Sequence, residues 1–282
     1  MTRYLITGAT GMLGADLQAA LVERTVTALG RSELDITDLD AVRSAAAGHD
    51  VVINAAAYTK VDDAESDEER ARAVNALGAR NVAIAASENR AKMVQLSTDY
   101  VFDGRATSPY PEDEARDPIS AYGRTKAEGE VLAMQSNEWT YIVRTAWLYG
   151  AAGPNFPKTM LRLAGSHDTV KVVNDQLGQP TWTADLANQI VRMLDADAAP
   201  GIYHATNAGE TTWFEFTREV FRLAGLDEAR VLPTTSNEFV RPAPRPTYSV
   251  LGHAAWSAAG LEPMRDWRTA FAEAFATGAL AP

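Results

Sequence analysis

The stretch Tyr4-Leu5-Ile6-Thr7-Gly8-Ala9-Thr10-Gly11-Met12-Leu13-Gly14 decides the fold. It reads as a short buried strand that runs into glycines at every third position, with a helix expected over Ala15–Arg24. Gly8 permits a tight turn, Gly11 lets a diphosphate approach the backbone, and Gly14 lets the helix pack close to the sheet. A glycine motif alone is weak evidence. Its place directly after an N-terminal strand predicts a dinucleotide site.

Strands and helices alternate beyond this stretch. Apolar strands are expected at Arg3–Thr7, Thr25–Leu29, Asp50–Asn54, Ala91–Ser97 and Trp139–Arg144. Five alternations in sequence predict an α/β fold with a doubly wound, Rossmann-like parallel sheet. After Tyr149-Gly150 the pattern changes, which predicts a smaller, interleaved α/β lobe that binds the substrate. We assign residues 1–148 and about 182–200 to the dinucleotide-binding domain, and about 149–181 and 201–282 to the second lobe.

Composition narrows the class of protein. The 282 residues are 46% apolar and carry a net charge of −11, which argues against a nucleic-acid or anionic-membrane partner. The chain has no cysteine, so disulfides and thiolate metal sites are excluded, as fits a reducing cytosol. We see no signal peptide and no apolar run of the roughly 18 residues that a membrane helix needs. A cytoplasmic protein is expected.

The end of the second expected strand bears on the choice of cofactor. In dinucleotide enzymes an acidic residue there binds the adenosine ribose and repels a 2′-phosphate. Here the end reads Leu29-Gly30-Arg31-Ser32, with no carboxylate at the tip and a cation and a hydroxyl beside it. We therefore expect NADPH and leave NADH open as a second donor. The alternative is that Arg31 is only a solvated loop residue.

Three side chains predict the chemistry. Thr98 falls at the C-terminal end of an apolar strand, and Tyr122 and Lys126 stand four apart on an expected helix, so they share a face. A tyrosine beside a cation can hold or give a proton near neutral pH, which the reduction of a ketone requires. A tyrosine and a lysine four apart are also common surface residues. The glycine turn and Thr98 favour the catalytic interpretation.

Several motifs in one order carry a family resemblance. They are Gly8-x-x-Gly11-x-x-Gly14, Asn54-Ala55-Ala56-Ala57, Ser97-Thr98-Asp99-Tyr100-Val101-Phe102-Asp103-Gly104, Tyr122-Gly123-x-Thr125-Lys126, Arg144-Thr145-x-Trp147 and Gly178-x-Pro180-Thr181. Together they resemble the dTDP-4-dehydrorhamnose reductase family, in the extended branch of the short-chain dehydrogenase/reductase superfamily. The resemblance implies reduction of dTDP-4-dehydro-L-rhamnose to dTDP-L-rhamnose by a reduced nicotinamide cofactor.

The resemblance also implies roles for single residues. Tyr122 is the expected proton donor, and Lys126 is expected to hold the nicotinamide ribose and to lower the pKa of Tyr122. Thr98 would hydrogen-bond the C4 oxygen, Asp99 would contact the sugar, and Trp147 would lie over the sugar ring, with core packing as its alternative. The expected cofactor-binding residues are Gly8, Gly11, Met12, Leu13, Gly14, Gly30, Arg31, Asp35, Ile36, Ala55, Ala56 and Ala57, together with Tyr122 and Lys126.

Two further expectations concern anions and metals. Arg241 and Arg245 suit a nucleotide diphosphate electrostatically, although their flanking prolines equally suit a surface loop. Some members of the family form a dimer around Mg²⁺ held by acidic side chains. Here Trp182-Thr183-Ala184-Asp185 has alanine where a glutamate is expected, so bound Mg²⁺ is doubtful. We expect no metal ligands, and a monomer or weak homodimer.

Three rival functions remain at this point. A 4,6-dehydratase would be expected to have glutamate where Tyr100 stands, so the acid needed for loss of water is missing. A 4-ketoreductase that makes another dTDP-deoxysugar for a secondary metabolite fits the same residues. A regulatory subunit that binds dinucleotide without catalysis would have little need of Thr98, Tyr122 and Lys126 together.

Overall fold

A six-stranded sheet is the largest feature of the computed structural model, which describes residues 1–281. Its strands are β1 (Arg3–Thr7), β2 (Thr25–Leu29), β3 (Val51–Asn54), β4 (Lys92–Thr98), β5 (Thr140–Thr145) and β10 (Gly201–His204). Their spatial order is β10-β5-β4-β3-β1-β2, and every pair is parallel. The winding direction changes between β1 and β3, and ligands bind at the carboxyl ends of strands beside such a point. The predicted α/β, doubly wound class is confirmed.

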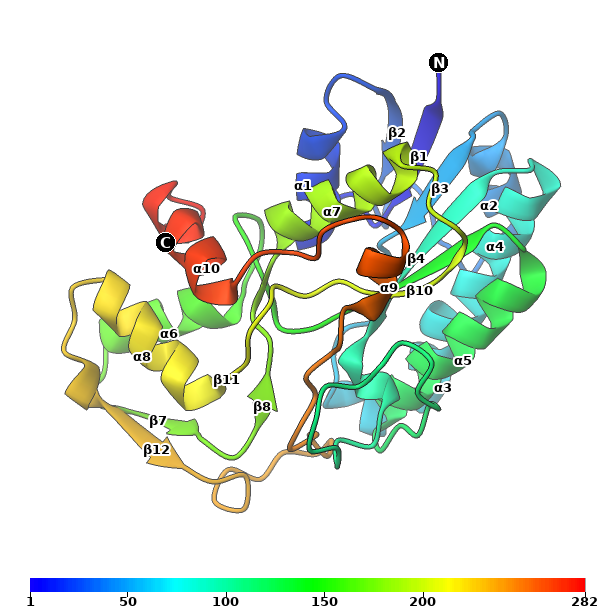
Figure 1. The fold of residues 1–282 in the computed structure, drawn as a ribbon. Coiled ribbons are helices and arrows are strands. Elements are labelled where there is room, and N and C mark those ends of the chain that lie inside the picture. The colour runs from blue at the N-terminus through cyan, green and yellow to red at the C-terminus, as the bar shows by residue number, and fades with distance from the viewer. Residues whose placement is uncertain (282) are drawn as a thin grey trace.

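Helices cover both faces of this sheet (Figure 1). One face carries α1 (Met12–Ala20) and α7 (Thr183–Asp195); the other carries α2 (Leu39–Ala46), α3 (Glu68–Arg72), α4 (Ala79–Glu88) and α5 (Ala121–Ser136). Neighbouring residues of a strand point to opposite faces. Ile6 accordingly packs in the core under α1 and α7, and Leu5 packs in the core under α2 and α4. Both faces are apolar, which explains the continuous apolar strands.

The second lobe has its own aromatic core. It contains α6 (Phe156–Ala164), α8 (Trp213–Leu223) and α10 (Trp267–Ala276), with three strand pairs: β6 (Leu148–Tyr149) with β9 (Thr181–Trp182), β7 (Val170–Val173) with β12 (Val231–Thr234), and β8 (Leu177–Gly178) with β11 (Thr211–Thr212). Phe216, Trp267 and Phe271 are fully buried between these elements. The lobe lies to one side of the sheet in Figure 1.

The sheet extends past the boundary that we expected at residue 201. β10 pairs with β5 as an edge strand, and Trp256 of α9 (Ala254–Ala258) packs in the core of the sheet. After α7 the chain returns to the sheet, where β10 supplies the hydrogen-bonding partner for the outer side of β5. We therefore propose that the dinucleotide-binding domain includes β10 and α9 in addition to 1–148 and 182–200.

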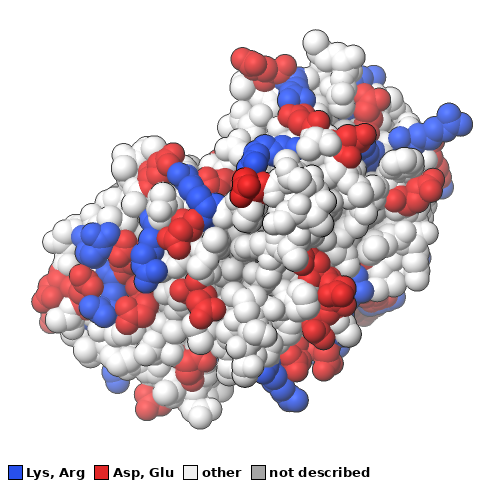
Figure 2. Space-filling view, in the orientation of Figure 1, with Lys and Arg blue, Asp and Glu red and all other residues white. Residues whose placement is uncertain are grey.

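Other differences from expectation are local. α1 begins at Met12 and not at Ala15, because Gly11 already stands at the N-cap position. The long helix expected over Asp62–Arg90 is interrupted by a π-helical segment, η2 (Ala73–Gly78). None of the helices in the part of the chain that the structure describes is long and apolar enough to cross a bilayer. On the face in Figure 2, acidic and basic side chains are interspersed over both lobes.

Candidate active site

The glycine turn after β1 is built for a close ligand. Gly8 has a φ of +69°, and a Cβ there would lie 2.6 Å from the Ala56 amide nitrogen. At Gly14 a Cβ would lie 2.4 Å from the Gly8 carbonyl oxygen, so α1 packs directly on the turn. No side chain caps α1 at Gly11, and its first amides remain available to an anion. The turn fits a dinucleotide diphosphate, with Met12 and Leu13 in the first turn of α1.

The end of β2 corrects our sequence interpretation. We expected no carboxylate at this tip, but Glu33 folds back and its Oε2 accepts a hydrogen bond from the Gly30 amide at 2.8 Å. Sequence inspection missed this acid because it stands four residues after Leu29, the last residue of the strand. Arg31 is exposed beside it. The tip therefore presents one acid and one cation to an adenosine ribose.

The other residues expected at the adenosine end have structural partners. Asp35 is exposed, and its Oδ1 accepts hydrogen bonds from the Thr37 amide at 2.9 Å and the Thr37 hydroxyl at 2.8 Å. These bonds lower the pKa of Asp35 below its ordinary value, and the charge of Arg31 adds to this effect. Ile36 is buried in the core under α2 and α4. Any contact of Ile36 with a cofactor would involve its backbone.

Small residues follow β3 at the carboxyl edge of the sheet. Ala55, Ala56 and Ala57 are only partly buried there, next to Gly8. Buried polar side chains join the strand ends behind them: the Thr7 hydroxyl donates to Asn54 Oδ1 at 2.6 Å, and Asn54 Nδ2 donates to Gln95 Oε1 at 2.7 Å. This chain of hydrogen bonds holds β1, β3 and β4 in register where a cofactor would lie.

The three candidate catalytic side chains meet at the end of β4. Thr98 is the last residue of that strand, and its Oγ1 donates to Asp99 Oδ1 at 2.9 Å. Tyr122 and Lys126 stand on one face of α5, whose N-cap Ser120 accepts a hydrogen bond from the Gly123 amide. Lys126 Nζ donates to the Leu96 carbonyl oxygen at 2.6 Å. The expected constellation is therefore present around β4 and α5.

Burial sets the electrostatics of these groups. It raises the pKa of Tyr122 well above its ordinary value; the Asp99 carboxylate adds to the rise, and hydrogen bonding with Thr98 opposes it. It lowers the pKa of Lys126 to about 8, an effect that Glu130 opposes. It also raises the pKa of Asp99 to about 6. A neutral phenol that hydrogen-bonds with Thr98, one helical turn from a buried amine, suits transfer of a proton.

The π-helical segment braces the catalytic helix. Asn75 is buried within it, and its Oδ1 accepts from the Tyr58 amide at 2.9 Å. Its Nδ2 donates to the Thr125 hydroxyl, on α5 between the two candidate catalytic residues, at 3.1 Å. α5 approaches closely there, because a Cβ on Gly129 would lie 2.1 Å from the Asn75 carbonyl oxygen. Such π segments are frequent at functional sites.

A buried ion network lies under the catalytic helix. Glu130 of α5 and Arg144 of β5 are fully buried, and their side chains pair at 2.8 Å and 2.9 Å. Arg116 Nε donates to the same carboxylate at 2.5 Å, and so does the Ser97 hydroxyl. Our sequence interpretation missed this network. The sequence did contain a signal: Arg144 is a charged residue within an apolar strand, and a buried charge needs a partner.

Trp147 has a different environment from the one we expected. Its φ of +47° is uncommon for a residue with a side chain, and its ring stacks on Trp213 with centroids 3.5 Å apart and 10° between planes. Gly178 abuts the same indole, since a Cβ there would lie 2.5 Å from ring carbons. One face of Trp147 is thus occupied by the protein. A role in sugar binding is left to its remaining, partly exposed surface.

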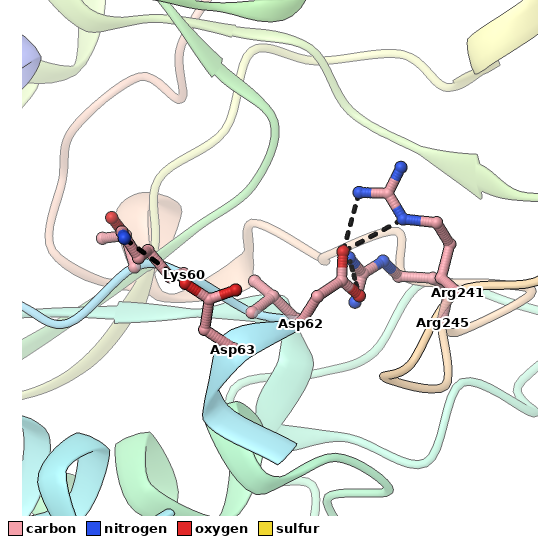
Figure 3. Close-up of a pocket in the computed structure, with 7 residues that line it drawn as sticks. Lys60, Asp62, Asp63, Arg241 and Arg245 are labelled. Atoms are coloured by element: carbon pink, nitrogen blue, oxygen red, sulfur yellow. Dashed lines mark hydrogen bonds and ion pairs between the residues drawn. The ribbon is translucent and has the colours of Figure 1, made fainter. Parts of the chain in front are cut away.

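The two expected diphosphate arginines already share a partner. Asp62 Oδ2 accepts from Arg241 at 2.7 Å and 3.0 Å, and Asp62 Oδ1 accepts from Arg245 at 3.0 Å. Figure 3 shows both guanidinium groups directed at this carboxylate, in a pocket of about 350 Å³. The Arg245 guanidinium also lies 5.8 Å from the Tyr100 ring centroid, and Tyr100 packs edge-on against Tyr122. The pocket therefore adjoins the candidate catalytic residues.

The stretch with the missing glutamate is occupied by an internal ion pair. Both carboxylate oxygens of Asp185 accept from Arg265 at 2.9 Å, and Asn207 donates to it at 2.8 Å. Among residues 1–281 no three His, Asp or Glu side chains gather as metal ligands would. Asp185 is thus engaged within the chain.

Similarity to known proteins covers almost the whole chain. The RmlD substrate binding domain family matches residues 2–279. A dTDP-4-dehydrorhamnose reductase of Streptomyces griseus is 55% identical (97% of this chain, 93% of the relative), and a probable dTDP-4,6-dihydroxy-2-methyloxan-3-one 4-ketoreductase of Streptomyces antibioticus is 50% identical (97% and 94%). The crystal structure of dTDP-4-dehydrorhamnose reductase from Bacillus anthracis in complex with NADP is 38% identical with a TM-score of 0.93, covering 98% of this chain and 100% of that chain. The protein therefore belongs to the RmlD substrate binding domain family, the family of the dTDP-4-dehydrorhamnose reductases, as its motifs suggested.

Proposed function

We propose that this protein reduces the C4 ketone of dTDP-4-dehydro-L-rhamnose to give dTDP-L-rhamnose. The observation that carries the proposal is the meeting of Thr98, Tyr122 and Lys126 at the carboxyl end of β4, on the same edge of the sheet as the glycine turn after β1. Reduced nicotinamide supplies the hydride when it is bound. Every other requirement of a ketone reduction falls to the side chains of this chain.

The residues divide this work by their chemistry. The Tyr122 phenol is neutral at physiological pH and gives its proton to the carbonyl oxygen, while Thr98 hydrogen-bonds the same oxygen. Lys126, as an ammonium, would hold the nicotinamide ribose and would stabilise the Tyr122 phenolate that forms as the proton leaves. Asp99 is buried beside Thr98 and Ser249, and it is the acid that would contact the sugar.

The cofactor proposed is NADPH, with NADH as a second donor. A relative in this family was solved with NADP, and the exposed Arg31 after the end of β2 supports contact with a 2′-phosphate. Glu33 opposes this preference, because a carboxylate at the strand end favours a free ribose hydroxyl. Both donors are therefore expected to work. Values of kcat/KM with each donor measure the balance, and exclusive use of NADH would contradict the proposal.

Tyr122→Phe tests the mechanism. Turnover is expected to fall at least about 100-fold while NADPH still binds, because the variant loses the general acid and little else. The decrease in NADPH absorbance gives turnover, and quenching of protein fluorescence gives NADPH affinity. Tyr203→Phe is the control: it alters a tyrosine that bonds the Ala199 carbonyl oxygen away from the site. Near-normal turnover in Tyr122→Phe would contradict the role of Tyr122 as the proton donor.

A second candidate is reduction of a different dTDP-4-keto-sugar. It is favoured by the similarity to the probable 4-ketoreductase of Streptomyces antibioticus at 50% identity. Kinetics with a panel of dTDP-keto-sugars separates the candidates, since the true substrate has the highest kcat/KM. We also propose a monomer or weak homodimer, because Asp185 is held by Arg265 within the chain. Sedimentation with and without Mg²⁺ tests that proposal.

A further inference from the structure

The buried carboxylate of Glu130 touches every element that carries the candidate catalytic groups. It stands on α5 at the third position of a stripe that begins with Tyr122 and Lys126, at intervals of four residues, so all three share one helix face. Its Oε1 accepts from the Ser97 hydroxyl at 2.5 Å, and Ser97 directly precedes Thr98 on β4. One side chain thus joins α5 to the end of β4.

The same carboxylate also reaches β5 and the loop before α5. Arg144 Nε donates to Oε1 at 2.9 Å and Arg144 Nη2 donates to Oε2 at 2.8 Å; Arg116 Nε completes the set at 2.5 Å. Four hydrogen bonds from three segments satisfy both oxygens. The side chains of Glu130 and Arg144 have no exposed surface, so a change of charge cannot be screened by water.

A plain structural role leaves one feature unexplained. A buried ion pair is weak evidence of stability, because well-packed apolar residues often serve as well. Here the carboxylate also lies near the candidate active site: Lys126 is one helical turn from Glu130, is buried, and donates a hydrogen bond to the Leu96 carbonyl oxygen. Glu130 is the carboxylate that acts on this amine.

We propose that Glu130 is a positioning residue for the reaction, which keeps Lys126 an ammonium and holds Thr98 in line with Tyr122. This inference rests on the proposed role of Lys126. The charged and titratable groups that face the pair are Tyr122 on α5, Asp99 after β4, Arg144 on β5, Arg116 in the preceding loop and His204 on β10. His204 is neutral, because burial lowers its pKa to about 3, and its Nε2 accepts from Arg144 at 3.2 Å.

The sign of the pH effect follows from the charge of Lys126. The ammonium is the competent form, so NADPH affinity and kcat/KM fall as the pH rises through the pKa of Lys126. Burial sets this pKa at about 8, and Glu130 opposes any further decrease. Removal of the Glu130 carboxylate therefore lowers the pKa of Lys126 further. The alkaline limb of the pH profile should then move toward lower pH.

Glu130→Gln is the first variant to measure. We expect the alkaline limb of NADPH affinity and of kcat/KM to move about one unit toward acid, as is typical when a neighbouring opposite charge is removed. Glu128→Gln is the matched control, because Glu128 lies on the same helix but pairs with exposed Arg72 and should leave the limb unchanged. If Glu130 had only a structural role, Glu130→Gln would reduce the amount of folded protein, but the protein that does fold would keep the wild-type alkaline limb of its pH profile.

Further variants keep the test decisive if Glu130→Gln does not fold. The double variant Glu130→Met with Arg144→Met removes both buried charges, so it should fold. Its limb should move toward acid by less than in Glu130→Gln, because a cation is lost together with the carboxylate. Arg116→Gln removes a cation from the network and should move the limb the other way, by less. A wild-type limb in a folded variant without Glu130 would overturn the proposal. If neither Glu130 variant folds, Arg116→Gln decides: an alkaline limb of its pH profile that is unmoved, or that moves toward acid, would overturn the proposal.

Lys126→Met separates this inference from the proposed function. Loss of turnover in Lys126→Met, with a wild-type limb in folded Glu130 variants, would reject only the role of Glu130. Normal NADPH affinity and turnover in Lys126→Met would instead reject the proposed role of Lys126 itself. The two failures are therefore distinguishable.

Discussion

Two clusters in this protein have the same composition and opposite surroundings. Under the catalytic helix, Glu130 binds Arg144 and Arg116; in the pocket of Figure 3, Asp62 binds Arg241 and Arg245. Each is one carboxylate with two arginines at similar distances. The side chains of Glu130 and Arg144 are 0% exposed, whereas those of Asp62 and Arg241 are 22% and 46% exposed.

The difference teaches what a charge cluster can do. A buried cluster cannot lose a partner without leaving a charge in a medium that solvates it poorly, so it holds the surrounding elements in one arrangement. An accessible cluster can exchange one anion for another at little cost. The pKa of Glu130 and that of Asp62 are both lowered overall, because their arginines outweigh the effect of burial. The Asp62 cluster is the more accessible of the two, because all three of its side chains are partly exposed, whereas in the other cluster only Arg116 reaches solvent.

The largest expected effect is on stability. Arg144→Ala leaves Glu130 buried with only Arg116 and Ser97, and we expect the free energy of unfolding to fall by about 3–5 kcal/mol. Arg241→Ala is the matching change in the accessible cluster and should cost less than about 1 kcal/mol. Urea denaturation of both variants measures the difference. Equal losses would contradict the distinction between the two clusters.

A smaller effect is expected on ligand affinity. Arg245→Ala should weaken binding of dTDP about 10- to 100-fold, since a charge-assisted bond to the diphosphate is lost. Isothermal titration of the variant with dTDP gives the affinity. Arg43→Ala provides the control, because Arg43 pairs with Glu88 on the far helices and should bind dTDP normally. Unchanged affinity in Arg245→Ala would mean that the diphosphate lies elsewhere.

The smallest effect tests exchange at Asp62. A phosphate that approaches Arg241 and Arg245 must compete with this carboxylate, so Asp62→Asn should tighten dTDP binding by a few fold, and less at high salt. Asp63→Asn is the matched control: Asp63 is the next residue and pairs with Lys60 alone, as Figure 3 shows. Weaker binding in Asp62→Asn would show instead that Asp62 orients the arginines.

Much of the fold and part of the site could be predicted from local patterns. Continuous apolar strands, the spacing of Gly8, Gly11 and Gly14, and the four-residue step from Tyr122 to Lys126 depend on neighbours in the chain. Local steric and helical rules act on such neighbours in the same way in any protein. The predicted sheet and the meeting of Thr98 with Tyr122 followed from these rules and are present in the structure.

The remaining features were decided by tertiary structure. The ring of Trp147 is stacked on Trp213, and Asp62 meets Arg241 across 179 positions of sequence. No periodicity links such partners, because the path of the chain through both lobes determines which side chains meet. The sequence by itself determined the sheet and which residues are candidates for catalysis. Only folding decided which charges are buried together and which stay open to a ligand, since burial is a property of the packed molecule.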